Sequence, residues 1–100
     1  MIIIKVTYPN KEKADKTITY LLKRGLISSA NLFPIKSTSK WTGEIKEVDE
    51  IIVLLKTRES NWEKVKREIE KMHPYKIPCI TKINAEANKD YEEWVNKQTE

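Results

Sequence analysis

The residues best suited to chemistry are the single histidine of the chain, His73, and its single cysteine, Cys79, six positions further on. Imidazole and thiolate groups together are ligands that copper, zinc and similar metals prefer. With one histidine, the chain can form neither an imidazole pair nor an H-E-x-x-H zinc motif, so a complete metal site would need several subunits. We therefore predict His73 and Cys79 as candidate metal ligands, with no obligatory cofactor.

Both residues also have purely structural explanations. His73 follows a predicted helix, where a partly positive imidazole would stabilise the helix dipole by about 0.3 to 1 kcal/mol. Cys79 is predicted on a strand that starts beside His73, and a cysteine buried in a strand behaves as a small hydrophobic residue. No third residue is placed to complete a Cys-His hydrolase, and no glycine-rich phosphate loop is present. The chain is therefore predicted not to be an enzyme.

Lysine and arginine outnumber aspartate and glutamate by 19 to 15, which gives a formal charge of +4. The lysines are spread over the whole chain, a pattern typical of a solvated surface and not of a nucleic-acid footprint. Glu44, Glu47, Asp49 and Glu50 could attract hard cations, although a solvated loop is the commoner arrangement. Neither feature indicates a nucleic-acid partner, and none is expected.

The chain has a mean hydropathy of −0.62. No apolar run approaches the roughly 20 residues that a membrane-spanning helix requires, and no signal-peptide pattern is present. A single cysteine is typical of a reducing compartment. We therefore predict a cytoplasmic protein without a membrane segment. Because no repeat or flexible linker interrupts the 100 residues, one domain is expected over residues 1–100.

Hydrophobic residues alternate over residues 2–8 and predict a first strand that ends at Pro9. Asn10 is a suitable N-cap for the helix that follows. The apolar residues of this helix recur at helical spacing, and Gly25 is suited to end it. The helix therefore has one apolar side, which must pack on something apolar.

A long hairpin is predicted in the middle of the chain. Its first strand runs over residues 26–38, and Pro34 places that strand at a sheet edge or a bulge because proline has no N–H to donate. Residues 41–43 are expected to form the turn. The return strand covers residues 45–57, and the unbroken apolar run 51–55 within it is typical of a central strand covered on both faces.

The last third of the chain predicts a helix, a strand and a further helix. Ser60 and Glu63 match the S-x-x-E capping box that opens a helix. Pro74 is expected to end that helix. A strand is then predicted over residues 77–85, and Asn88 is suited to open a short terminal helix.

The resulting order is βαββαβ with an extra C-terminal helix, which predicts an α+β protein with the ferredoxin-like sandwich. Two helices cover one face of the sheet in this arrangement. The other face would leave a large apolar patch on a monomer, so we expect a homo-oligomer whose sheets pack together. Trp41, Trp62 and Trp94 are interpreted as core or subunit-contact residues, and stacking of a ligand on Trp41 is the less common alternative.

Several short motifs occur in the order and spacing typical of one family over nearly the whole chain. They are Tyr8-Pro9-Asn10, Leu26 with Asn31 and Pro34, Trp41 with Gly43 and Ile45, Lys56-Thr57, His73-Pro74-Tyr75 with Pro78, and Tyr91 with Trp94. With these motifs the chain resembles the CutA divalent-cation tolerance proteins. The His-Pro-Tyr-x-x-Pro stretch after a helix, together with the Trp-x-Gly hairpin, is the most specific part of the resemblance.

The resemblance implies a single CutA-like domain that forms a homotrimer with subunit clefts similar to those of PII signalling proteins. It implies weak binding of copper or a similar metal at sites that include His73, and it places Trp41, Lys56 and Tyr75 at the clefts. Two departures bear on the metal. Lys76 and Cys79 stand where the family usually carries acidic residues, so a soft ligand is gained at Cys79. Ser29 stands where bacterial members carry a cysteine, and a hydroxyl is a far poorer copper ligand.

Three alternatives follow from the same pattern. A PII-like signalling module would bind a small anionic ligand or a partner protein in the subunit clefts. An RNA-recognition motif shares the strand order, but its central strands carry aromatic residues that stack on bases, and residues 52–55 carry none. An acylphosphatase-like hydrolase would need an arginine in the loop before the first helix, and the first arginine, Arg24, comes late in that helix.

Overall fold

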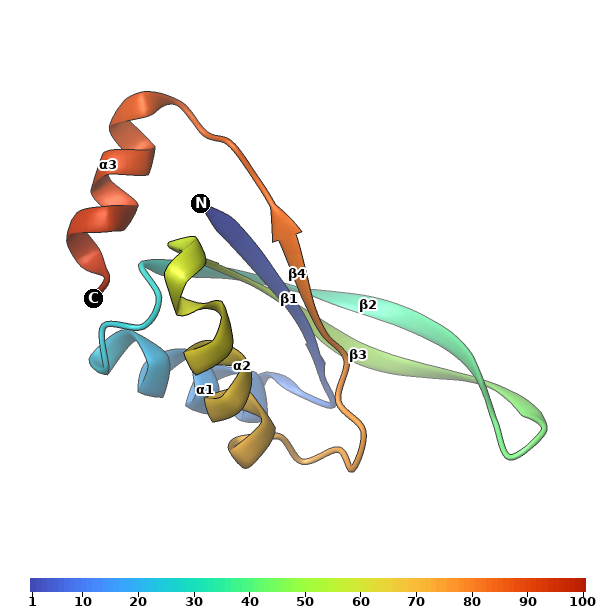
Figure 1. Cartoon of the computed structure of the whole chain (residues 1–100). Helices are drawn as coiled ribbons and strands as arrows, with labels where there is room; N and C mark the ends of the chain where they lie inside the picture. The colour runs from blue at the N-terminus through green and yellow to red at the C-terminus, as the bar shows by residue number, and fades with distance from the viewer.

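The computed structural model describes all 100 residues. Four strands form one antiparallel sheet in the order β2-β3-β1-β4, with β3 and β1 in the centre (Figure 1). The elements follow one another as β1 (Ile2–Tyr8), α1 (Lys11–Lys23), β2 (Ser29–Trp41), β3 (Glu44–Thr57), a short 3-10 helix η1 (Glu59–Asn61), α2 (Trp62–Met72), β4 (Ile80–Asn84) and α3 (Lys89–Gln98). The predicted α+β fold, the βαββαβ order of its elements and the central position of the strand with the apolar run 51–55 are confirmed.

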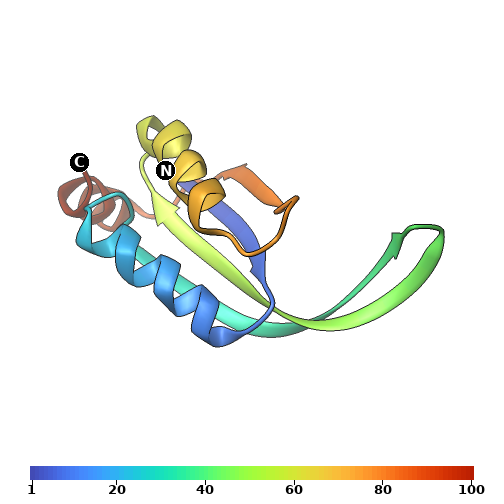
Figure 2. The same ribbon diagram turned by 90° about the horizontal axis from the view of Figure 1, so that it is seen from below.

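The period-2 pattern of β1 separates the two faces of the sheet. Ile2, Ile4, Val6 and Tyr8 are buried under α1 and α2, together with Val53 and Leu55 of β3 and the apolar sides of the two helices. Figure 2 shows both helices on this face. The strand residues that alternate with these buried ones point to the other face of the sheet, which we call the open face. Its strand residues in the four-stranded region include Ile3, Lys5, Thr7, Phe33, Ile52, Leu54, Thr81 and Ile83.

Helix α1 begins as the sequence predicts. The Asn10 side chain accepts a hydrogen bond of 2.9 Å from the backbone N–H of Lys13 and so caps the helix. Gly25 follows the helix at a φ of +68°, a conformation that glycine adopts without steric cost.

The start of α2 differs from the prediction. Ser60 lies inside η1, and α2 begins only at Trp62, with Asn61 as its N-cap residue and no side-chain capping bond. Asn61 is instead buried, and its amide donates to the backbone carbonyl of Leu26 and to the hydroxyl of Thr57, both at 3.2 Å. The predicted capping box is therefore wrong. The buried amide connects α2 to the sheet, and this connection fixes the entry to the helix.

Strands β2 and β3 continue as a two-stranded arm well beyond the rest of the sheet (Figures 1 and 2). They pair from Ser29 opposite Lys56 to Trp41 opposite Glu44, whereas β1 pairs with β3 only as far as Ile51. Thr42 and Gly43 form the turn at φ values of 49° and 83°, the positive values that a two-residue type I′ hairpin requires. The edge position predicted from Pro34 is confirmed, because β2 is the outer strand.

Strand β4 is shorter than predicted. It covers Ile80–Asn84, whereas the hydrophobic pattern indicates residues 77–85. Pro74 and Pro78 lie in the preceding segment, and proline cannot donate a hydrogen bond to the sheet. Residues 74–79 therefore form a loop that precedes the strand.

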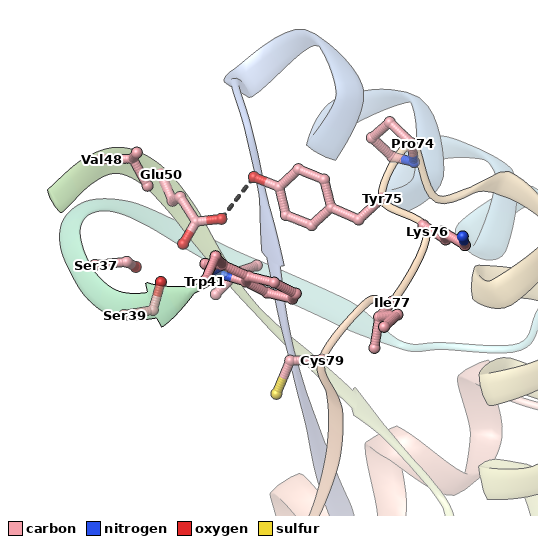
Figure 3. A pocket seen from close by; sticks show the side chains of 11 residues that line it. Ser37, Ser39, Trp41, Val48, Glu50, Pro74, Tyr75, Lys76, Ile77 and Cys79 are labelled. Carbon is pink, nitrogen blue, oxygen red and sulfur yellow. Dashed lines mark hydrogen bonds between the residues drawn. The ribbon is translucent and has the colours of Figure 1, made fainter. Parts of the chain in front are cut away.

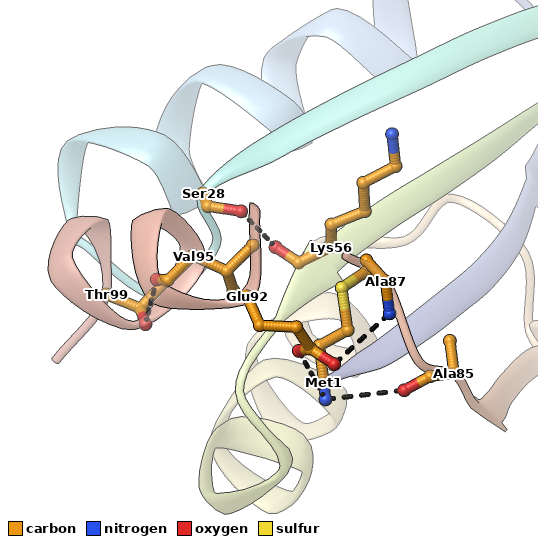
Figure 4. A network of polar contacts seen from close by, with 8 residues as sticks. All are labelled: Met1, Ser28, Lys56, Ala85, Ala87, Glu92, Val95 and Thr99. Atoms are coloured by element: carbon orange, nitrogen blue, oxygen red, sulfur yellow. Dashed lines mark hydrogen bonds and ion pairs between the residues drawn. The ribbon is translucent and has the colours of Figure 1, made fainter. Parts of the chain in front are cut away.

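Helix α3 packs across the end of the sheet where Met1 lies (Figure 4). The Glu92 carboxylate accepts from the terminal amine of Met1 at 2.9 Å and from the backbone N–H of Ala87 at 3.2 Å. Arg58 donates to the hydroxyl of Thr99 at 2.9 Å and to two backbone carbonyls near the end of α3. These bonds tie α3 to β1 and β3.

None of the helices combines the length and the apolar character needed to cross a membrane.

Candidate functional site

A hollow of about 640 Å³ lies on the open face, between the hairpin arm and the loop of residues 74–79 (Figure 3). Such a volume lies in the range typical of small-molecule sites. Its wall is formed by Thr7, Ser37, Ser39, Trp41, Val48, Glu50, Pro74, Tyr75, Lys76, Ile77 and Cys79.

The alternation of the strands places these side chains together. Ser37, Ser39 and Trp41 follow one another at every second position of β2 and therefore point to one side of the arm. Glu50 faces the same side from β3. The loop after α2 supplies the opposite wall. Trp41 has 55% of its surface exposed, so in the single chain it is a surface residue and not part of the core.

Tyr75 connects the loop to the arm. Its hydroxyl donates a 2.6 Å hydrogen bond to the Glu50 carboxylate, as the dashed line in Figure 3 shows. Burial and then this bond raise the pKa of the Tyr75 phenol well above its usual range. The phenol therefore stays protonated at neutral pH and acts as a hydrogen-bond donor that holds the hollow together.

His73 lies behind this wall and does not line the hollow. Its Nε2 is 2.7 Å from the backbone carbonyl of Thr7, and its Nδ1 accepts from the backbone N–H of Tyr75 at 3.0 Å. These two bonds together define the neutral tautomer that carries its proton on Nε2. The ring also stacks on Tyr8 with 4.5 Å between ring centres. Burial lowers the pKa of His73. A metal ion could bind this imidazole only by displacing one of the two bonds.

Cys79 is exposed and lines the hollow from the loop, directly before β4. Its Sγ lies 3.5 Å from the hydroxyl of Thr81. The expectation that Cys79 is buried in a strand is therefore wrong, because β4 begins only at Ile80. The Cys79 thiol is open to solvent in the single chain, so a metal ion could reach it.

Lys56 lies away from the other predicted cleft residues. It faces Ser29 at the far end of the open face, and its amine lies 5.7 Å from the centre of the Tyr91 ring. The Ser29 and Tyr91 hydroxyls are hydrogen-bonded at 3.2 Å. Within one chain, the structure thus brings together Trp41, Tyr75 and Cys79 but not Lys56.

No group of three or more histidine, cysteine, aspartate or glutamate side chains lies close enough together to hold a metal ion. The acidic residues near the hairpin turn are divided between its two sides. Glu44 and Glu50 face the hollow side, whereas Glu47 and Asp49 face away, and Asp49 pairs with Lys36 at 2.6 Å. A metal site in this protein would therefore need ligands from more than one chain.

Comparison with known proteins identifies the family. The model of the CutA1 divalent ion tolerance protein family matches residues 2–98. The chain belongs to this family. It is 41% identical over 100 residues to the divalent-cation tolerance protein CutA of Pyrococcus horikoshii, covering 99% of this chain and 98% of the relative. It is 35% identical to the Archaeoglobus fulgidus protein of the same name, over 97% of this chain and 96% of the relative.

Solved structures agree with this fold. The P. horikoshii CutA crystal structure obtained in 3 M guanidine hydrochloride superposes with a TM-score of 0.97 at 40% identity and covers 100% of both chains. The apo form of the PII-like protein CutA from Nostoc gives a TM-score of 0.93 over 100% of this chain and 98% of that chain. At 24% identity, this second likeness shows the shared fold alone. The CutA resemblance and the ferredoxin-like, PII-like subunit predicted from the sequence are confirmed.

Sequence reasoning missed several residues of the hollow. Glu50 was assigned to a solvated acidic group, although it is the hydrogen-bond partner of Tyr75. Ser37, Ser39 and Val48 attracted no attention because the arm carries few hydrophobic residues. Continuing the alternation of β2 beyond Ile35 would have placed Ser37 and Ser39 on the side of Trp41, and the register of the hairpin would then have placed Val48 opposite Ser37.

Proposed function

We propose that the protein acts in divalent-cation tolerance as a non-enzymatic homotrimer that binds copper or a similar metal weakly. The observation that carries this proposal is the match of residues 2–98 to the CutA1 family. The neutral His73, with both ring nitrogens bonded to the backbone, supports the non-enzymatic part because it cannot serve as a base for Cys79 without rearrangement.

Exposed apolar surface supports the homotrimer. Phe33 and Ile83 lie on the open face with 44% and 41% of their surfaces exposed. Ile3, Ile52 and Leu54 lie between them in the sheet register. An exposed apolar face of this kind is typical of an interaction surface. Closing three copies into a ring would bury it and would protect the outer edges of β2 and β4 from uncontrolled strand pairing.

Cys79 is the better anchor for a metal ion of the two predicted ligands. Its thiol lines the hollow and makes one weak polar contact, whereas binding at His73 would break a bond to Thr7 or Tyr75. One thiolate does not hold copper firmly, so further ligands would come from neighbouring copies. The expected binding is therefore weak and depends on the trimer.

Calorimetric titration of the metal-free protein with copper under anaerobic conditions tests the metal site. Heat should be released by the wild type and by Ser39→Ala, which changes the same hollow without removing a ligand. It should be lost in Cys79→Ser, and His73→Ala tests the second ligand. Absence of heat with copper, zinc and nickel would remove the metal from the proposal and leave the fold unaffected.

The hollow itself favours a second candidate function, a PII-like module that binds a small anionic ligand or a partner protein. Trp41, Tyr75 and Ile77 give an apolar wall, and Lys76 adds a cationic group. A thermal-shift screen over nucleotides and organic acids, compared between the wild type and Trp41→Ala, tests this candidate. Ligands that stabilise both proteins equally would show that the hollow is not their binding site.

The proposed location is the cytoplasm, as the composition predicts. The A. fulgidus relative of known structure is named as a periplasmic protein. Cell fractionation with antibody detection would place this protein in one compartment or the other.

A further inference from the structure

We propose that Lys5, together with the hydroxyls of Thr7 and Thr81, binds an inorganic oxyanion such as phosphate on the open face of the assembled protein. This inference rests on the proposed homotrimer, because the site is complete only when other copies cover the open face. It adds an anion to an assembly that the proposed function links to cations.

Lys5 occupies the centre of the open face. On β1 it is paired with Leu54 of β3 on one side and with Thr81 of β4 on the other. Cross-strand partners in antiparallel sheets have Cβ atoms about 4.5 to 5.5 Å apart, so the Thr81 hydroxyl lies within reach of the Lys5 side chain. Thr7 follows on the same face two positions along β1.

These three residues form a polar group within an apolar surface. Ile3 and Ile83 lie on one side of it, and Ile52 and Leu54 lie on the other in the register of the sheet. One ammonium and two hydroxyls supply several hydrogen-bond donors and a single positive charge. This combination suits a small oxyanion, which has several acceptor oxygens and a negative charge.

The charge of Lys5 has no counterpart within the chain. Eight ion pairs are present, and none of them includes Lys5. The register places only two carboxylates among the strand residues of the open face, Glu44 at the tip of the arm and Glu50. Glu50 already accepts the hydroxyl of Tyr75. An ammonium group covered by apolar neighbours requires a counter-charge, and this face offers no free carboxylate near it.

Symmetry increases this requirement. Each copy brings one Lys5 and one Lys56 to the four-stranded part of the open face, and Glu50, the next carboxylate along β3 on this face, lies beyond that part on the arm. Three copies therefore gather an excess of positive charge in the surface that the trimer would bury. A bound oxyanion neutralises this excess and accepts hydrogen bonds from the same groups, which explains how a lysine can occupy the centre of an interface.

The test begins with sedimentation of the wild type, which reports the assembly independently of any anion. Inorganic phosphate is then titrated into the protein by calorimetry, and the thermal midpoint is compared between phosphate and chloride buffers of equal ionic strength. The variants are Lys5→Met, which keeps the length of the side chain, Lys5→Arg, which keeps its charge, and Lys13→Met, a control on the exposed surface of α1.

Phosphate should bind to the wild type, to Lys5→Arg and to Lys13→Met, and should raise their thermal midpoints. Lys5→Met should bind phosphate about tenfold to a hundredfold more weakly and should show the same midpoint in both buffers. A monomeric wild type would overturn the assembly and this inference together. A wild-type trimer that is indifferent to phosphate, or a Lys5→Met trimer that responds as strongly as the wild type, would overturn the anion site alone.

Discussion

Replacing Tyr8 by phenylalanine should stabilise the fold, because it removes a buried hydroxyl that has no hydrogen-bond partner. Tyr8 is 1% exposed, and its hydroxyl has no hydrogen-bond partner. Burial raises the pKa of this phenol, and a weaker influence of the Thr17 hydroxyl acts in the opposite direction. Burying a hydroxyl without a partner costs about 1 to 3 kcal/mol in proteins.

Tyr8→Phe retains the aromatic ring that stacks on His73 and leaves no cavity. Allowing for the influence of Thr17, we expect the free energy of unfolding to rise by about 1 kcal/mol. Tyr8→Ala, which removes the ring, should lower it by about 3 to 5 kcal/mol. Urea unfolding measures both values and should be carried out at one protein concentration, because unfolding of an oligomer depends on concentration.

A double-mutant cycle with Thr17→Val distinguishes a Tyr8 hydroxyl without a partner from one that is hydrogen-bonded to Thr17. If the Tyr8 hydroxyl lacks a partner, the coupling energy between the two positions should be close to zero. A loss of more than about 1 kcal/mol in Tyr8→Phe would show that the hydroxyl is hydrogen-bonded in solution and would refute the reasoning.

Three further predictions concern pH and the hairpin turn. Burial lowers the pKa of His73, so the unfolded chain binds its proton more readily, and stability should fall as the pH drops below about 6.5. Urea unfolding from pH 5 to 8 should show this loss in the wild type and not in His73→Phe. The hydrogen bonds of Glu92 to the Met1 amine and to Ala87 lower the pKa of that carboxyl, so its contribution is present above the usual carboxyl pKa and is lost as the pH falls through the lowered value. Glu92→Gln should therefore flatten the acid end of the stability profile. Thr42 adopts a φ of 49°, which asparagine tolerates better than a β-branched residue, so Thr42→Asn should raise the thermal midpoint, whereas Thr42→Val should lower it.

The sequence predicts most of the fold because its strongest signals are local. The alternation over residues 2–8 correctly indicates β1, and the apolar run 51–55 correctly indicates that β3 is a central strand. Asn10 and Gly25 correctly mark the ends of α1, since each has a conformational reason to stand where it does. These features need no knowledge of distant contacts.

The errors arise where distant contacts determine the local structure. Ser60 and Glu63 have the spacing of a capping box, but Asn61 is bound to Leu26 and Thr57 of other elements, and these bonds fix the start of α2. Cys79 lies in a segment with the hydrophobic residues of a strand, yet the sheet pairs with this segment only from Ile80 onward. No local pattern carries this information.

The candidate site is the least predictable part because it joins two distant segments. The His-Pro-Tyr motif draws attention to Tyr75, but its hydroxyl donates to Glu50, which lies 25 positions earlier in the chain on another element. The placement of Lys56 at the opposite end follows from the register of β3. The metal roles of His73 and Cys79 stay predictions.

The measurement that tests the central claim most directly is sedimentation equilibrium of the untagged protein at micromolar concentration. We predict a single species with three times the chain mass of 11.8 kDa, and a Phe33→Glu variant that dissociates, because a charge on the open face opposes its burial. A wild-type protein that sediments as one folded chain would contradict the proposed trimer and the burial of the open face.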